Sequence, residues 1–189
     1  MYTISKNIEN TIIINKSKFI CCLIKIKNEE DALNNLKILK EKYVGATHYC
    51  YSYITSNIKR FSDDGEPGGT AGMPILNVLE NNDLNNILCV VIRYFGGIKL
   101  GAGGLVRAYT KSVTEALANI DIVEIKKGFK IKIIFTYDQV KYIDNLFKDN
   151  IILDKVFKDN ITYTILIEEK ELEKLNNLNI IEKENILFS

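Results

Sequence analysis

Glycine and proline are confined to the middle of this chain, and their distribution limits where the chain can turn sharply. Nine of the eleven glycines and both prolines lie between residues 65 and 104. One glycine, Gly128, follows, and the 61 residues after it contain neither type, so asparagine and aspartate must form their turns. Residues 1–127 carry 16 basic and 13 acidic side chains, whereas residues 128–189 carry 9 and 11. We therefore expect a domain boundary near Gly128, with domains spanning 1–127 and 128–189.

Composition and cysteine spacing argue against several classes of protein. The chain has 189 residues, a hydrophobic fraction of 47% and a net charge of +1, so it can bury a core without disulfides or a structural metal. Its four cysteines form no Cys-x-x-Cys pair, which predicts free thiols. The longest apolar run has six residues, whereas a helix needs roughly 20 to span a bilayer. The first ten residues lack the features of a signal peptide. We expect a cytoplasmic protein with no cofactor, no metal and no membrane partner.

Apolar periodicity predicts alternating strands and helices in the first domain. Two paired strands are expected within residues 11–26, followed by a helix over 28–43 with Asn28 at its N-cap. The inward face of that helix should carry Ala32, Leu33, Leu36 and Leu39. The remaining expected elements are a strand, a short helix, a buried strand and a long helix, at 47–55, from Pro74, at 87–94 and at 105–119. This pattern predicts an α+β fold with helices packed on a sheet.

The second domain is expected to follow the order strand, helix, strand, strand, helix, strand. The four strands should span residues 130–137, 151–157, 161–167 and 180–188. Asp138 should cap the first helix, and residues 168–178 should form the second. The order βαββαβ is that of the ferredoxin-like sandwich.

Residues 93–111 contain the strongest indication of function. An apolar strand ends at Arg93, and five glycines follow before a helix. Residues 84–114 contain four basic side chains and no acidic one, and only three arginines, Arg60, Arg93 and Arg107, occur in the whole chain. Glycines, a helix N-terminus and cations together favour an anion site, although a tight strand-to-helix connection is the alternative. The candidate phosphate- or nucleic-acid-binding residues are Arg93, Tyr94, Gly96, Gly97, Lys99, Gly101, Gly103, Gly104, Arg107 and Lys111.

A second segment, residues 59–72, places Asp63, Asp64 and Glu66 on a loop with several glycines. Three carboxylates within four residues could hold Mg²⁺, bond their own backbone, or pair with the arginines of the other segment. We favour arginine pairing or turn structure over a metal site. We expect no catalytic residue, because the loop contains no nucleophile with a companion histidine.

Tyr49, Tyr51 and Tyr53 alternate with other residues along one expected strand, so their rings should share one sheet face. Such rings can stack nucleobases, but tyrosine is also a good strand residue, and we favour a structural role. His48 should lie on the opposite face as a packed core residue.

Three stretches of this sequence closely resemble the IMPACT/YigZ family. They are Ser-Asp-Asp-Gly-Glu-Pro-Gly-Gly-Thr-Ala-Gly-Met-Pro-Ile-Leu at 62–76, the segment from Val-Val-Ile-Arg-Tyr-Phe-Gly-Gly to Val-Arg-Ala-Tyr at 90–109, and Ala-Thr-His-Tyr-Cys-Tyr at 46–51. The resemblance implies a first domain with a βαβ topology similar to a ribosomal-protein domain and to kinases of the GHMP type. It also implies a ferredoxin-like second domain similar to domain V of elongation factor G.

The resemblance also implies a role in translation. Eukaryotic relatives regulate translation by binding the activator of a starvation-responsive kinase, a partner that bacteria lack, so only a nucleic-acid or ribosome-linked role carries over. We expect a non-catalytic RNA- or ribosome-binding regulator. The alternative is a Mg²⁺-dependent enzyme acting on nucleotides or phosphate esters, which would require Asp63, Asp64 or Glu66 to hold the metal.

Overall fold

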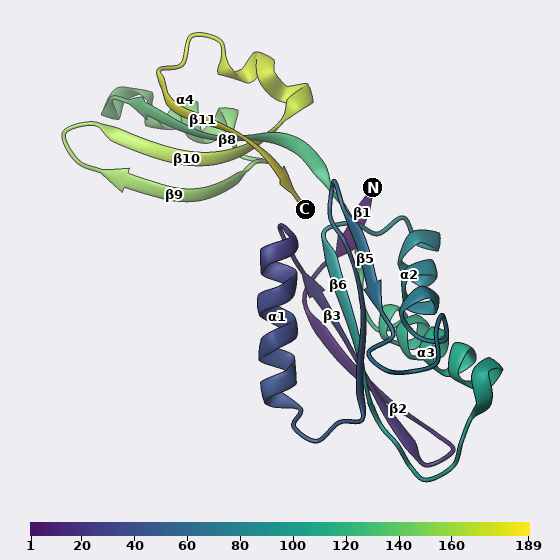
Figure 1. Ribbon diagram of the computed structural model, residues 1–189. Helices are drawn as coiled ribbons and strands as arrows, with labels where there is room; N and C mark the ends of the chain where they lie inside the picture. The colour runs from purple at the N-terminus through teal and green to yellow at the C-terminus, as the bar shows by residue number, and fades with distance from the viewer. The chain divides into compact units, whose positions relative to one another are not determined.

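The computed structural model describes residues 1–189, which form two compact units, Met1–Glu124 and Ile125–Ser189 (Figure 1). The second unit begins with strand β8 (Lys126–Phe135), so a division after residue 127 would fall inside this strand. The fold is of mixed α+β type in both units. None of its helices has both the length and the apolar character needed to cross a membrane.

The first unit is built on a five-stranded sheet with the order β2-β3-β6-β4-β5, in which all neighbours are antiparallel. These strands span Ile8–Ile14, Ser17–Lys25, Ile87–Tyr94, His48–Ile54 and Lys59–Ser62. Because β3 and β4 both run antiparallel to β6, they are parallel to each other and α1 (Glu29–Lys42) connects them. The result is a βαβ unit with β6 inserted between its two strands. Two short strands, β1 (Tyr2–Ile4) and β7 (Ile122–Glu124), pair separately.

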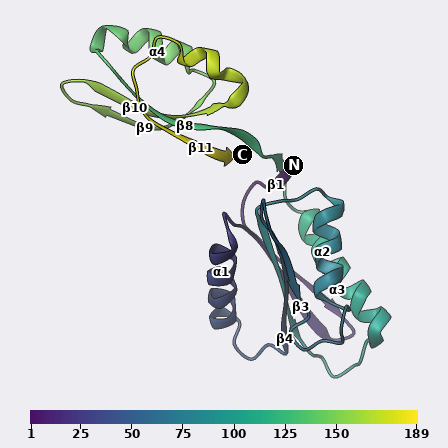
Figure 2. The ribbon, with the colours of Figure 1, turned by 45° about the horizontal axis from the view of Figure 1, so that its top comes forward.

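Helices cover both faces of this sheet (Figure 2). Helix α1 packs on one face, where the core contains Ile20, Cys22, Ala32, Leu36, Leu39, Leu88, Val90 and Ile92. Helices α2 (Gly72–Asn81) and α3 (Gly101–Leu117) pack on the other, where the core contains Phe19, Cys21, Leu23, Ile75, Leu79, Cys89, Val91, Tyr109 and Val113. Strand β6 is buried on both faces, which explains the uninterrupted apolar sequence of its first six residues.

The second unit has a four-stranded antiparallel sheet with the order β11-β8-β10-β9. Its strands β9, β10 and β11 span Ile151–Phe157, Ile161–Glu168 and Ile180–Phe188. A 3₁₀ turn at Tyr137–Gln139 leads into α4 (Val140–Leu146), and a 3₁₀ helix at Glu169–Leu175 precedes β11. Element order and strand order agree with the expected βαββαβ arrangement. The core of this unit contains Ile131, Ile133, Ile143, Phe147, Ile161, Tyr163, Ile165 and Ile167.

Several local expectations need correction. Leu33 is 49% exposed, because Ala32, Leu36 and Leu39 already fill the inward stripe and Leu33 lies one residue outside it. Asp138 does not cap α4, since Thr136 and Gln139 form a capping box around the preceding 3₁₀ turn. The segment after Glu168 is a 3₁₀ helix that ends at Leu175, rather than a longer α-helix.

A fragment of residues 1–124 should unfold cooperatively by itself, because its two cores draw only on residues of this unit. Thermal denaturation followed by circular dichroism would measure this. A shorter fragment ending at Leu100 lacks α3 and leaves the core around Phe19 and Leu23 uncovered, so it should show no cooperative transition. A broad, non-cooperative melt of residues 1–124 would contradict independent folding.

Candidate functional site

The glycine-rich segment after β6 is only partly a loop. Strand β6 ends at Tyr94 and α3 begins at Gly101, so Gly103 and Gly104 lie in the first turn of the helix. The expected helix start at residue 105 is therefore wrong by four residues. The chain turns at Gly97 and Gly101, whose φ angles of 86° and 69° favour glycine. These turns bring the N-terminus of α3 next to the end of β6.

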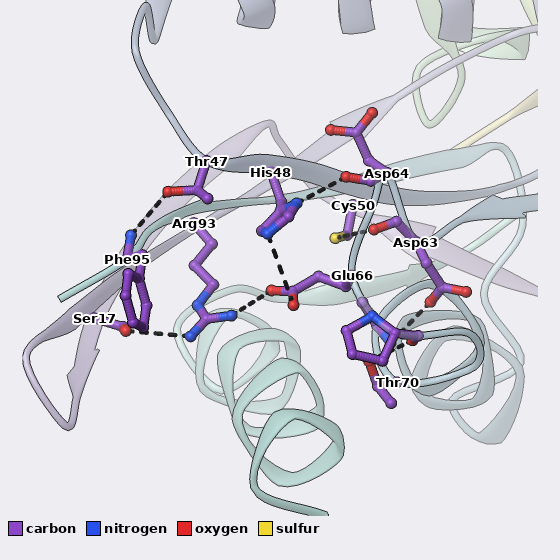
Figure 3. A network of polar contacts seen from close by, with 12 residues as sticks. Ser17, Thr47, His48, Cys50, Asp63, Asp64, Glu66, Thr70, Arg93 and Phe95 are labelled. Carbon is purple, nitrogen blue, oxygen red and sulfur yellow. Dashed lines mark hydrogen bonds and ion pairs between the residues drawn. The ribbon is translucent and has the colours of Figure 1, made fainter. Parts of the chain in front are cut away.

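Arg93, near the end of β6, is held by a buried ion pair with Glu66. Its Nη1 donates to Oε1 of Glu66 over 2.6 Å, and its Nη2 donates to Oγ of Ser17 over 3.4 Å (Figure 3). The Arg93 and Glu66 side chains are only 5% and 3% exposed. One of the three acidic-loop carboxylates thus makes the arginine pairing expected from the sequence.

Two further protonated groups, the hydroxyl of Tyr109 and the thiol of Cys50, adjoin this ion pair. Tyr109 donates its hydroxyl to Oε1 of Glu66 over 2.8 Å, and Sγ of Cys50 lies 3.3 Å from that hydroxyl and 3.0 Å from the carbonyl oxygen of Asp63. Burial raises the pKa of Cys50 to about 12 and also raises the pKa of Tyr109. Cys50 therefore remains a thiol at neutral pH and is not an activated nucleophile.

Asp63 and Asp64 pair with backbone groups rather than with an arginine. Asp63 accepts hydrogen bonds from the backbone N–H groups of Gly69, Ala71 and Gly72, at 2.8–2.9 Å. It thereby caps α2, whose own N-cap residue provides no side-chain bond. Burial raises the pKa of Asp63, but the three backbone bonds outweigh it and hold the pKa below its usual value.

Asp64 fixes the loop against β4. Its Oδ2 accepts from the backbone N–H of Tyr49 over 2.7 Å, and its Oδ1 lies 3.7 Å from Nζ of Lys40. With Asp63 capping α2 and Glu66 bound to Arg93, all three carboxylates have partners within the chain. The turn alternative therefore describes Asp63, and the arginine alternative describes Glu66, whereas Asp64 follows neither because it bonds the backbone of β4.

His48 was expected to be a packed core residue, but it is only partly buried. Its side chain is 19% exposed, and its Nε2 lies 3.8 Å from Oε2 of Glu66. Nδ1 lies 2.8 Å from the carbonyl oxygen of Asp64. A carbonyl oxygen can only accept a hydrogen bond, so Nδ1 carries the proton that it donates to Asp64. The other ring nitrogen, Nε2, faces Glu66 (Figure 3).

A cavity of about 430 Å³ opens beside the ion pair. Its walls are formed by Thr47, His48, Glu66, Pro67, Arg93, Phe95, Lys99, Leu100, Gly101, Ala102 and Leu105. The Nε of Arg93 is buried and has no hydrogen-bond partner. Helix α3, whose first residues line the same cavity, has no side-chain cap, so its first N–H groups are available to an anion. The cavity therefore lies between the Arg93–Glu66 ion pair and the uncapped N-terminus of α3.

The other predicted site residues lie in different surroundings. Lys99 and Arg107 are exposed and form no ion pair within the chain, while Lys111 lies 3.5 Å from Glu115. Tyr94 packs on the α1 side of the sheet, away from the cavity. Gly96 allows close packing, because a Cβ there would lie 2.0 Å from the carbonyl carbon of Lys16. The packing alternative is thus correct at Gly96.

The tyrosine stripe of β4 has a structural role. Tyr49, Tyr51 and Tyr53 share the face that packs against α1, and the rings of Tyr51 and Tyr53 are stacked with centroids 6.3 Å apart. The hydroxyl of Tyr49 donates to the carbonyl oxygen of Tyr43 over 2.6 Å. The cavity lies on the opposite face with His48, so these rings do not contribute to it.

Sequence reasoning missed several residues of the cavity, namely Thr47, Pro67, Phe95, Leu100, Ala102 and Leu105. His48 is opposite Arg93 in the β4–β6 register, which is why Thr47 and His48 reach the site. Thr47 also accepts from the backbone N–H of Phe95 over 3.0 Å. Only Phe95 was detectable in advance, because it directly follows the arginine strand in a glycine-rich segment.

The fold and the site define a two-unit α+β protein with an arginine-containing cavity at a helix N-terminus. Residues 15–117 match the family model described as the Impact N-terminal domain. IMPACT family member YvyE of Bacillus subtilis is 40% identical over 175 residues, which cover 90% of this chain and 81% of that protein. The chain belongs to the IMPACT family.

Two further comparisons agree with this assignment. IMPACT family member YigZ of Escherichia coli is 40% identical over 112 residues, covering 57% of this chain and 55% of that protein. A crystal structure of a hypothetical protein aligns with a TM-score of 0.63 and 28% identity, covering 97% of this chain and 98% of that one.

Proposed function

We propose that this protein is a non-catalytic regulator that binds nucleic acid, RNA in particular, either free or within the ribosome. The observation that carries the proposal is a cavity lined both by Arg93, whose buried Nε has no hydrogen-bond partner, and by the uncapped N-terminus of α3. A buried donor without a partner is unfavourable by about 1–3 kcal/mol, so a ligand that accepts from it would stabilise the site. Helix N-termini and exposed cations are the groups that bind phosphates.

The surface around the cavity supports phosphate binding. Exposed Lys99 lies before the first turn of α3 and exposed Arg107 lies in its second turn, and neither has an acidic partner. Their charges add to the partial positive charge of the helix N-terminus. The net charge of the whole protein is only +1, so we expect this local surface, rather than a general basic excess, to hold the phosphate backbone.

The Mg²⁺-dependent enzyme is the weaker candidate. That function would require at least two of the loop carboxylates to be free for a hard cation, whereas Asp63 caps α2 and Glu66 is paired with Arg93. The thiol of Cys50 is held in its protonated form by burial. The geometry thus favours binding over chemistry.

The connection to translation rests on membership of the IMPACT family and on the resemblance to its eukaryotic regulators. A ribosome-linked role would place the protein in the cytoplasm. We do not assign the phosphate contacts to the second unit, because its 11 basic and 11 acidic side chains, over residues 125–189, sum to a net charge of zero. The first unit is therefore the proposed nucleic-acid-binding part.

Replacing both Lys99 and Arg107 by alanine should weaken binding of a single-stranded RNA 12-mer and reduce its dependence on salt. Each lost phosphate contact reduces the magnitude of the negative slope of log K against log salt by about 0.7, so the slope of the double variant should be shallower by about 1.4. Fluorescence anisotropy between 50 and 200 mM salt would measure both quantities.

The matched control replaces Lys37 and Arg60 by alanine. Both residues are exposed, carry the same two charges and lie on α1 and β5, away from the cavity. The control should leave the slope unchanged. Equal slopes for the two double variants would refute the phosphate assignment, and Mg²⁺-dependent turnover of a phosphate ester by the wild type would favour the enzyme instead.

A further inference from the structure

We propose that the cavity receives one unstacked base of a single-stranded nucleic acid, while Lys99, Arg107 and the N-terminus of α3 hold the adjoining phosphates. The inference rests on the proposed function and specifies its ligand. In this proposal the interior of the cavity binds the base, and the residues at its mouth bind the phosphates. The protein would therefore bind unpaired nucleotides in preference to duplexes.

The polar groups inside the cavity suit a neutral ligand edge better than a phosphate. Arg93 is already neutralised by Glu66 at 2.6 Å, and the pair is only 5% and 3% exposed. A phosphate placed against Arg93 Nε would also approach the Glu66 carboxylate, and like charges at short range repel in a buried site. A ring nitrogen or carbonyl oxygen of a base can accept from Nε without that repulsion.

Glu66 provides the complementary acceptor. Oε1 of Glu66 already accepts from Arg93 and Tyr109, whereas Oε2 has only His48 Nε2 near it, at 3.8 Å, beyond hydrogen-bond distance. Oε2 can therefore accept from an exocyclic amino or ring N–H group. A donor from Arg93 beside an acceptor from Glu66 matches the edge of a nucleobase, which presents both kinds of group.

The walls of the cavity provide a surface for the base ring. Phe95 is 46% exposed, lines the cavity, and has Arg93 Cζ 5.4 Å from its ring centroid (Figure 3). Pro67, Leu100 and Leu105 make the remaining wall apolar. Nucleobases stack on exposed aromatic rings in proteins that bind single strands. The volume of about 430 Å³ lies within the range of small-ligand sites.

The position of the rim relative to the interior fits a nucleotide chain. Gly101 and Ala102, the first residues of α3, line the same cavity as Arg93 and Phe95. Both are exposed, so a phosphate bound at their N–H groups would lie at the mouth while its base points inward. In a duplex the bases are paired and stacked, and none would be free to enter.

The test compares three fluorescein-labelled 12-mers on the full chain: a single-stranded RNA, the same RNA as a duplex, and a strand whose residues are all abasic. Stacking of one base contributes enough for about a tenfold difference in affinity. The single strand should bind about tenfold more tightly than the other two. Phe95→Ala should weaken binding of the single strand by about the same factor without changing its salt slope.

Phe61→Ala is the matched control, because Phe61 on β5 is 44% exposed and does not line the cavity. It should bind like the wild type. Equal binding of the abasic and the base-bearing strand, or equal affinities of the two phenylalanine variants, would overturn the base-binding inference while leaving phosphate binding intact. If none of the three probes binds, the proposed function fails together with the inference.

Discussion

Glu66→Ala is expected to lower the free energy of unfolding of the first unit by about 3–5 kcal/mol, because it leaves a buried guanidinium without its counter-ion. Arg93 is 4% exposed, and its remaining polar contact is a 3.4 Å bond to Ser17. The substitution also removes the acceptor of the Tyr109 hydroxyl. Urea denaturation of the full chain followed by circular dichroism would measure the change in stability.

A double variant provides the control for this prediction. Replacing Glu66 by leucine and Arg93 by methionine together removes both charges, and apolar substitutes for a buried ion pair are often neutral in stability. We therefore expect the double variant to recover most of the loss. If Glu66→Ala lowers the free energy of unfolding by less than about 1 kcal/mol, the ion pair is more hydrated than its burial indicates. That result would contradict the buried Arg93–Glu66 pair beside the cavity.

Asp63→Ala should also destabilise the first unit strongly, by about 2–5 kcal/mol, since each buried N–H without a partner costs about 1–3 kcal/mol. Asp63 accepts from the N–H groups of Ala71 and Gly72, which are buried. It also accepts from Gly69, which water can reach. Asp121→Ala is the control, because the Asp121 side chain is exposed and forms no hydrogen bond within the chain; it should change stability little.

The contribution of Asp63 should depend on pH. Its pKa in the folded protein lies below the usual value, because three backbone hydrogen bonds outweigh the opposing effect of burial. The stabilisation is therefore complete above the unfolded pKa, near pH 4, and is lost as the pH falls through the folded pKa. The stability difference between wild type and Asp63→Asn should shrink on acidification below pH 4. A difference that grows there would contradict the hydrogen-bond assignment.

The parts of the fold that were predictable have strong local patterns. Strand β6 was predicted at 87–94 and found at Ile87–Tyr94, because an apolar run flanked by polar residues defines its own limits. Asn28 was predicted to cap α1 and accepts from the backbone N–H of Asp31 over 2.9 Å. By contrast, β1 and β7 were missed, since each has three residues and they pair across more than 100 positions.

The site was predictable only where it depended on residue type. The scarcity of arginine in a lysine-rich chain indicated Arg93, and opposite charge predicted its pairing with the acidic loop. The cavity depended on information that no local pattern contains. His48 reaches it through the β4–β6 register, and Gly101 and Ala102 reach it because α3 begins four residues early. Glycine disfavours a helix interior, so the pattern placed the helix start too late.

The central claim is that the N-terminus of α3 and the adjoining cavity bind nucleic acid. The most direct measurement is an NMR titration of the isotope-labelled full chain with a single-stranded RNA 12-mer. The account predicts that the backbone N–H signals of Gly101, Ala102 and Gly103 and the Nε–H signal of Arg93 shift together, with one common midpoint. Binding that shifts signals elsewhere while these four remain unchanged would contradict it.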